Sequence, residues 1–427
     1  MHVVSLPSAN PAEHRRALDE VSDFASTDMG RGGPARWTYR VLTEPHLSAE
    51  LRRHAHPYSA NGVDGITFQP SPIHEFRNQD RSRVEHWPMH GGTWVFAAIF
   101  DGHVGHHTVD HAAQAIPAMV KHALDSYLRS SSRTAYAPER ISGILSDAIV
   151  RFDNSITEAF INLFPGGPST LQRMTEGQIR QIVDDRASGG RNYMTAVRCL
   201  QGTTALLTLT DPSKSNLWIA NLGDSQAVLA GRNPSGQWGV NFATTLHDGD
   251  NHHELHRLRH EHPGERDCAR DNRVIGFLGP TRSVGDTWLK VPALYSQRVL
   301  LSMRHEWNVD RPEHYISRIR SPPYVSNEPD VQHLPLPRGS RGRDLALIMC
   351  SDGLPDLYSR LSRRDAASHW ARVVGRSLDA RSPAPNLALL LLRDALGGDD
   401  VRLVSQYLTV EMDEKWTDDV TIIVQRF

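Results

Sequence analysis

The chain has 427 residues, of which 39% are hydrophobic and 22% charged, and its formal net charge is -2. This composition suffices for a sizeable buried core, and no apolar stretch is long enough to span a membrane. The balanced charge gives no basic surface of the kind that binds nucleic acid. We therefore expect a globular protein with no membrane span and no nucleic-acid partner.

Three cysteines, Cys199, Cys268 and Cys350, lie far apart in the sequence and form no Cys-x-x-Cys pair. They support neither a disulfide framework nor a cysteine zinc site, which favours a reducing, intracellular location. Acidic residues interrupt the arginines of the first forty residues, and no apolar segment follows them. This pattern is not typical of a targeting peptide.

Residues 1–60 are polar and weakly periodic, and we interpret them as an N-terminal extension of a domain that covers 61–427. The first strong element is an apolar strand at 93–100, which ends at Asp101. Helical spacing of apolar residues follows at 109–128 and 141–163.

The next part of the chain predicts an antiparallel meander of short strands between residues 202 and 230, with tight Gly and Asp turns. Residues 265–340 are irregular and rich in proline, which indicates an insertion or a lid, and we expect residues 290–340 to lie near the mouth of a site. A buried strand at 345–350 then ends just before Asp352, and a final strand at 420–424 directly follows Asp418 and Asp419.

Asp101, Asp352 and Asp418 thus share one property, since each lies at the end of an apolar strand. Such carboxylates can meet at one edge of a sheet, where half-buried acids repel one another unless a cation lies between them. Magnesium or manganese is the natural candidate, because hard cations prefer oxygen ligands. The alternative is that each acid only caps the turn after its strand.

Seven short blocks resemble, in order, the motifs of the type 2C metal-dependent serine/threonine protein phosphatases. They are residues 78–81, 100–103, 202–205, 221–225, 281–286, 351–353 and 418–421. Segments 254–263, 273–278 and 321–329 are most similar to the pyruvate dehydrogenase phosphatase branch. The resemblance implies an α+β fold in which two packed, mainly antiparallel sheets are flanked by helices, with the metals at one end of the sandwich.

The resemblance further implies a centre of two Mn²⁺ or Mg²⁺ ions that activates a water for attack on phosphoserine or phosphothreonine in a phosphoprotein. Asp101 would bridge the ions, the Gly102 carbonyl would bind one, and Asp352 and Asp418 would hold the other. His103 fits a general acid for the departing oxygen, and the alternative is a hydrogen bond that supports the metal ligands. Membership of this branch also implies a mitochondrial location, with the cytoplasm as the alternative.

Three positions depart from the family pattern. Gln79 stands where a glutamate is common beside Asp80, which we assign a catalytic role as a direct or outer-sphere ligand. Glu75 replaces an arginine that grips phosphate, so Arg77 is the predicted substitute. Residues 199–201 lack the acid of a third metal position, and we expect no third ion held by the protein.

Two other functions remain open at this point. A scaffold of the same fold without activity would be consistent with Gln79 and Glu75, although it would not need the acidic cluster. The Gly223-Asp224-Ser225 sequence also occurs in GDS-type esterases, but here it lies in the middle of the chain.

We interpret Asp224 and Asp286 as braces for loops.

Five histidines between residues 252 and 262 allow either a zinc site or a solvated charged helix, and the second is favoured. Oligomeric state is not predicted by any feature of the sequence.

Overall fold

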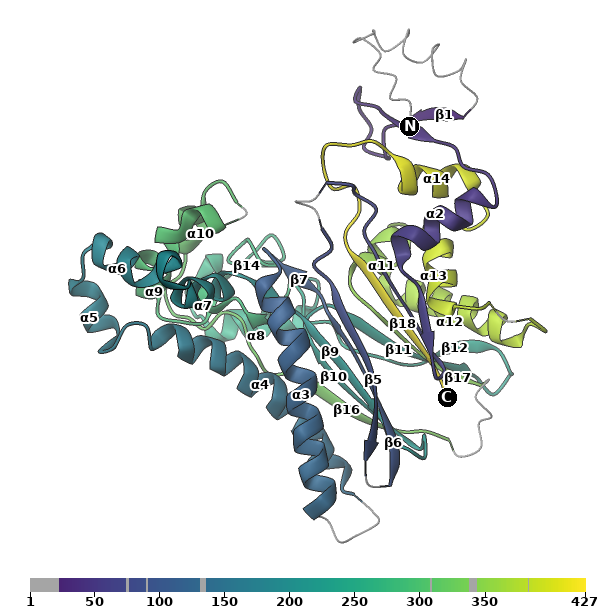
Figure 1. Cartoon of the computed structure of the whole chain (residues 1–427), viewed down its shortest axis with the longest axis horizontal. Helices are drawn as coiled ribbons and strands as arrows, with labels where there is room; N and C mark the ends of the chain where they lie inside the picture. The colour runs from purple at the N-terminus through teal and green to yellow at the C-terminus, as the bar shows by residue number, and fades with distance from the viewer. Residues whose placement is uncertain are drawn as a thin grey trace.

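In the computed structural model, the described residues are 23–73, 77–89, 91–130, 136–307, 309–337, 344–382 and 384–427. Two antiparallel sheets pack face to face, and helices cover both outer faces (Figure 1). The predicted α+β sandwich is confirmed. Within the described ranges, no helix combines the length and the apolar character that a membrane crossing requires.

The first sheet has five strands in the order β16-β10-β9-β6-β5. Apolar side chains on both faces explain its burial, since β6 is buried almost throughout and β9 entirely. The strands are β5 (Arg81–Met89), β6 (Gly92–Phe100), β9 (Ala205–Thr210), β10 (Asn216–Leu222) and β16 (Asp330–Pro335).

The second sheet has six strands in the order β12-β11-β17-β18-β4-β3. Its central strand β17 is buried along its whole length. The strands are β3 (Tyr58–Ala60), β4 (Val63–Phe68), β11 (Gln226–Arg232), β12 (Trp238–Ala243), β17 (Leu345–Cys350) and β18 (Val420–Arg426).

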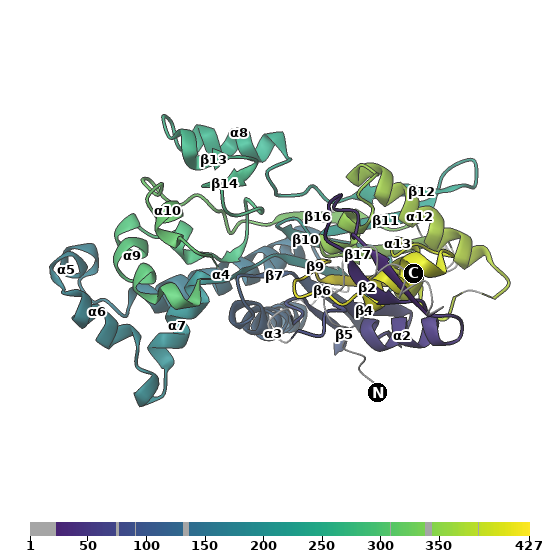
Figure 2. The ribbon, with the colours of Figure 1, turned by 90° about the horizontal axis from the view of Figure 1, so that it is seen from above.

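The hydrophobic core has three layers. Residues such as Ile99, Leu206 and Met349 fill the space between the two sheets. Helices α3 and α4 pack on the five-stranded sheet, whereas α2, α12 and α13 pack on the six-stranded sheet (Figures 1 and 2). The longer helices are α2 (His46–Ala55), α3 (His107–Ser130), α4 (Pro138–Ile161), α7 (Arg191–Leu200), α8 (His252–Glu261), α12 (Arg363–Asp379), α13 (Leu387–Ala395) and α14 (Val401–Thr409).

Short elements connect and extend the sandwich. The short helices are α5 (Gly167–Arg173), α6 (Glu176–Val183), α9 (Ala293–Arg298), α10 (Pro312–Ile316) and α11 (Gly353–Leu357), and the 3-10 turns are η2 (Arg186–Ser188), η3 (Arg266–Cys268), η4 (Thr287–Leu289) and η5 (Leu300–Glu306). The remaining strands are β1 (Phe24–Thr27), β2 (Trp37–Arg40), β7 (Gly102–His103), β8 (Gly202–Thr203), β13 (Ala269–Arg270), β14 (Arg273–Val274) and β15 (Val284–Gly285). Together, α5 to α7 and α9 form a helical lobe beside the sandwich (Figure 1).

The described part of the predicted N-terminal extension is ordered against the body. Leu47, Leu51 and Ala55 of α2 are buried in the core of the six-stranded sheet. Strand β3, which lies in the predicted extension, pairs with β4, which lies in the predicted domain. Of the predicted insertion at 265–340, β16 forms an edge of the five-stranded sheet. The division into domains stays a prediction.

Leu206 gives a direct test of the layer between the sheets, because its side chain is fully buried there. We expect Leu206→Ala to lower the free energy of unfolding by about 2 to 5 kcal/mol, since a cavity replaces packed methyl groups. Leu403→Ala is the control, because Leu403 is 38% exposed on α14 and should change stability by less than about 0.5 kcal/mol. Chemical denaturation measures both, and equal losses would contradict the packing described.

Candidate metal centre

A cavity of about 680 Å³ opens at one end of the sandwich. It lies where β6 and β17 end, where β18 begins, and beside the turn between β10 and β11. The structure brings five predicted site residues into its wall. They are Asp101, Gly102, His103, Asp352 and Asp418.

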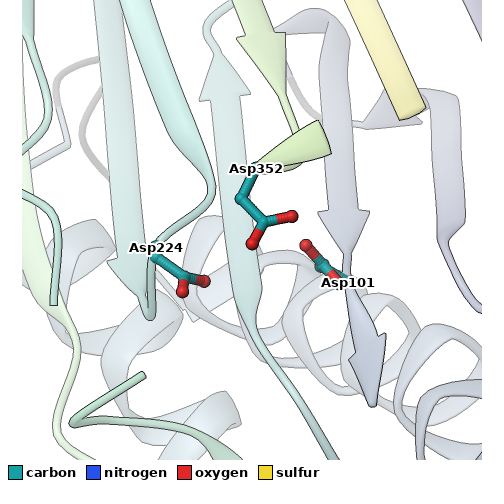
Figure 3. Close-up of side chains that lie close together, drawn as sticks. All are labelled: Asp101, Asp224 and Asp352. Atoms are coloured by element: carbon teal, nitrogen blue, oxygen red, sulfur yellow. The ribbon is translucent and has the colours of Figure 1, made fainter. Parts of the chain in front are cut away.

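Two groups of carboxylates in this wall have the spacing of metal ligands. Asp101, Asp224 and Asp352 offer oxygen atoms within 4.8 Å of one another, and Figure 3 shows the three carboxylates facing a common space. Asp352 also belongs to a second group with Asp356 and Asp418 at the same spacing. Asp352 is therefore common to both groups, whereas the resemblance gives the shared position to Asp101, whose bridging role stays a prediction.

The carboxylates of the cluster resist ionisation together. Burial and the charge of Asp352 raise the pKa of Asp101 well above its usual value, with further contributions from Asp80, Asp224 and Asp418. Burial, Asp224 and Asp418 likewise raise the pKa of Asp352. The pKa of Asp224 rises to about 6 because of burial and the nearby Asp248. Oxygen ligands in this state fit a hard divalent cation, whose charge would offset their repulsion.

Backbone hydrogen bonds hold the loops that carry these acids. The Asp101 amide donates to Thr204 Oγ1 at 3.2 Å, and the Thr204 amide donates to the Asp101 carbonyl at 2.9 Å. Thr204 Oγ1 also lies 2.9 Å from Ser225 Oγ in the turn that carries Asp224. Gly102 is required here, because an added Cβ would lie 2.7 Å from the Gln79 carbonyl oxygen.

His103 is held by a buried carboxylate. Its Nε2 lies 2.8 Å from Asp286 Oδ2, which also accepts a hydrogen bond from Ser283 Oγ at 2.6 Å. Burial alone would lower the pKa of His103, but the attraction of Asp286 outweighs it and raises the pKa. Gly202 leaves room for this pair, because an added Cβ would lie 2.1 Å from Asp286 Oδ2.

Asp80 lies behind the cavity wall rather than in it. Its side chain is buried and accepts a hydrogen bond from Ser351 Oγ at 2.7 Å, next to Asp352 in sequence. Burial and the charge of Asp419 raise its pKa to about 7. Within the described residues, Asp80 is therefore placed to support the ligand loops from behind.

The predicted phosphate residue Arg77 is exposed and is not among the residues that line the cavity. Gln79 does line the cavity, and its backbone amide donates a hydrogen bond to Asp419 Oδ2 at 2.8 Å. Glu75 lies outside the described residues. Arg363 and Lys415 bring positive charge to the cavity wall.

The competing sites receive less support. Ser225 is fully buried and hydrogen-bonded to Thr204, so its hydroxyl is not presented as an esterase nucleophile. His256 and His260 stack on α8 with ring centres 6.3 Å apart. Across the described ranges, the groups with metal-ligand spacing are the two carboxylate groups, and neither contains a histidine.

The sequence did not predict that Asp224 and Asp356 would lie in the carboxylate groups, or that Arg363 would line the cavity. Asp224 lies at metal-ligand spacing from Asp101 and Asp352, which its interpretation as a loop brace did not predict, whereas Asp286 is paired with His103. Asp356 follows Asp352 by one helical turn in α11, a spacing that could have identified it. Arg363 stands at the start of α12, and no local pattern links it to the acids.

A sandwich of two sheets with a carboxylate cluster and an acid-held histidine at one end has the features of a metal-dependent hydrolase. The model of the protein phosphatase 2C family matches residues 81–371. The chain belongs to this family of metal-dependent serine/threonine protein phosphatases.

Relatives support the same family. A protein phosphatase 2C homolog of Schizosaccharomyces pombe is 28% identical over 359 residues, which cover 78% of this chain and 73% of that protein. The mitochondrial pyruvate dehydrogenase (acetyl-transferring) phosphatase 1 of Saccharomyces cerevisiae is 26% identical over 64% of this chain and 44% of its own length. The human mitochondrial pyruvate dehydrogenase (acetyl-transferring) phosphatase 2 is 27% identical over 344 residues, which cover 70% of this chain and 61% of that protein. The chain thus spans about half the length of these pyruvate dehydrogenase phosphatases.

The fold has a solved counterpart in the serine-threonine phosphatase 2C of Toxoplasma gondii. The TM-score is 0.50 with 16% sequence identity, over 87% of this chain and 96% of that one. At this identity the likeness concerns the fold alone.

Asp224 makes the repulsion within the cluster measurable. In chelator-treated protein, its raised folded-state pKa means that stability is lost as pH rises from about 4 to about 6. We expect Asp224→Asn to remove this loss, so the variant should gain roughly 1 to 3 kcal/mol over the wild type between those pH values. Asp399→Asn, at an exposed position far along the chain, is the control. A pH-independent difference for Asp224→Asn would contradict the assigned repulsion.

Proposed function

We propose that the chain hydrolyses phosphoserine and phosphothreonine in proteins at a centre of two divalent cations, Mn²⁺ or Mg²⁺. The observation that carries the proposal is the convergence of Asp101, Asp224, Asp352, Asp356 and Asp418 on one cavity. Bound cations supply the Lewis acidity that activates water and neutralises phosphoryl oxygens. Family membership supports the metal dependence.

The chain's own residues would divide the ligand positions as follows. Asp101 and the Gly102 carbonyl would hold one cation, Asp352 and Asp418 would hold the other, and Asp101 would be shared between them. Asp224 and Asp356 each belong to one of the two carboxylate groups and are two further candidate ligands. Asp80 supports the Ser351-Asp352 loop through its bond to Ser351.

His103 acts as the general acid in this proposal. Its side chain is partly exposed in the cavity wall, while Nε2 is paired with Asp286. Asp286 raises the pKa of His103 and so favours the protonated ring, which is the form that donates a proton to a seryl or threonyl oxygen. A group of this kind is needed because an alkoxide is a poor leaving group.

The metal requirement is tested with purified protein and a phosphoserine peptide. We expect turnover with Mn²⁺ or Mg²⁺, loss of turnover with chelator, and a loss of at least about 100-fold in kcat for Asp101→Asn and Asp352→Asn, because each removes a charged ligand from the centre. Asp399→Asn should retain wild-type activity.

The scaffold alternative makes a different prediction for the same preparation. Protein that binds Mn²⁺ normally but turns over no phosphopeptide would establish the scaffold and refute the enzyme. Full activity in both Asp101→Asn and Asp352→Asn would refute the ligand assignment while leaving the fold intact.

The role of His103 is tested by changing the leaving group. We expect His103→Gln to lower kcat about 100-fold on a phosphoserine peptide, because the seryl oxygen needs a proton. The loss on p-nitrophenyl phosphate should be much smaller, because nitrophenolate leaves without one. Equal losses on both substrates would assign His103 to metal or substrate positioning instead.

Substrate and compartment follow from the relatives as proposals. These relatives are named as phosphatases of pyruvate dehydrogenase (acetyl-transferring) and as mitochondrial. We propose a phosphoprotein substrate and a mitochondrial location, with the cytoplasm as the alternative. Fractionation of cells that produce the tagged full-length protein distinguishes the two compartments.

A further inference from the structure

Besides His103, the cavity wall contains one lysine and two arginines, and two of these three side chains already have a partner. Lys415 Nζ lies 2.8 Å from Asp418 Oδ1 and 3.3 Å from Asp419 Oδ1. Arg273 Nη1 donates to the Phe277 carbonyl at 2.9 Å. The third is Arg363, the first residue of α12.

Arg363 has unused hydrogen-bonding capacity. Its nearest acid is Asp356, whose Oδ1 lies 3.6 Å from Nη2, beyond ordinary hydrogen-bond distance. The guanidinium makes no hydrogen bond to any described residue, and its Nη1 is enclosed without a partner. The described residues therefore leave donor capacity of the Arg363 guanidinium unused, and a ligand in the cavity that Arg363 lines can use it.

The electrostatic position of Arg363 fits the same conclusion. The side chain is 38% exposed, so a ligand in the cavity can reach it. Its charge acts on both Asp224 and Asp356, which belong to the two carboxylate groups of the centre. A cation at this place lies next to the point where a phosphoryl group would meet the metal ligands.

We propose that Arg363 binds the phosphoryl group of the substrate, beside the carboxylates that hold the cations. The inference rests on the proposed phosphatase function and assigns a residue to it. A phosphate monoester carries a charge between about -1.5 and -2 near neutral pH, and the planar guanidinium binds two phosphate oxygens at once. Arg363 takes the place that sequence reasoning gave to Arg77.

A purely structural role for Arg363 is the competing explanation. In that case the side chain would only neutralise Asp356 and fix the start of α12. An ion pair at 3.6 Å with both partners partly exposed contributes little to stability. Any purely structural effect of Arg363 would appear in thermal stability or in metal affinity, whereas a role in binding substrate appears in the affinity for phosphate.

The test uses the Mn²⁺-loaded full-length chain and inorganic phosphate as product inhibitor. We expect Arg363→Gln to raise the inhibition constant for phosphate and the KM for p-nitrophenyl phosphate by roughly 10- to 100-fold, as expected for loss of a charge-assisted hydrogen bond. Arg363→Lys should recover part of this loss, because it restores charge without the planar fork. Mn²⁺ affinity and the melting temperature should stay at wild-type values.

Arg364→Gln is the matched control, because it makes the same charge change one residue away at an exposed position outside the cavity wall. It should leave both constants unchanged. Arg77→Gln is the competing arm, and a rise in the phosphate constant with Arg77→Gln but not with Arg363→Gln would overturn the proposal. A change confined to melting temperature or Mn²⁺ affinity in Arg363→Gln would also overturn it.

Calorimetric titration of phosphate into the Mn²⁺-loaded protein separates this proposal from the phosphatase function. If the wild type shows no turnover, the phosphatase proposal fails, and phosphate binding still decides the role of Arg363. Weaker phosphate binding in Arg363→Gln supports the assignment, whereas equal binding or no binding by the wild type overturns it. If Arg363→Gln does not fold, phosphate binding by Arg363→Lys is compared with that of the wild type instead.

Discussion

Mutual repulsion among buried carboxylates is the constraint on which the rest of this site depends. Asp101 and Asp352 are half-buried and face one another, so loss of solvation and neighbouring charge both raise the pKa of each. In the absence of a cation, such a cluster destabilises the fold at neutral pH. With a divalent cation between the oxygens, the same charges become attractive, so binding and folding are coupled.

The two sheets exist in the arrangement that brings these acids together. Antiparallel pairing places the end of β17 beside the starts of β11 and β18, with Cys350 opposite Gln226 and Ile422. Asp352 follows the first of these strands and Asp418 precedes the last. The five-stranded sheet adds Asp101 at the end of β6, fixed to the Thr204 backbone. Because the sheets pack through their apolar faces, their ends lie together at the cavity.

Local pattern predicted the strands that deliver the acids. The expected strand at 345–350 coincides with β17, and the expected strand at 93–100 differs from β6 by one residue. These segments are buried on both faces, so their apolar runs are unambiguous. Helices α5 and α6 of the lobe were not predicted, because they are short and largely exposed.

The partners that complete the site were harder to predict for a physical reason. Asp224 and Arg363 come from a turn and a helix start that meet Asp101 only through long-range packing, so local sequence shows turn or helix signals alone. Arg77 was chosen by distance in sequence from Asp80, and the structure leaves it exposed outside the cavity wall. Proximity in sequence is therefore a poor guide to which arginine side chain lies beside the carboxylates.

The central claim is that the carboxylate cluster is a cation centre, and direct Mn²⁺ binding tests it most directly. Electron paramagnetic resonance or calorimetry at neutral pH should count two Mn²⁺ ions per wild-type chain. The Asp352→Asn variant should bind fewer ions, or bind them at least about tenfold more weakly, because Asp352 belongs to both carboxylate groups. A wild-type protein without Mn²⁺ binding, or an Asp352→Asn variant with unchanged stoichiometry and affinity, would contradict the account.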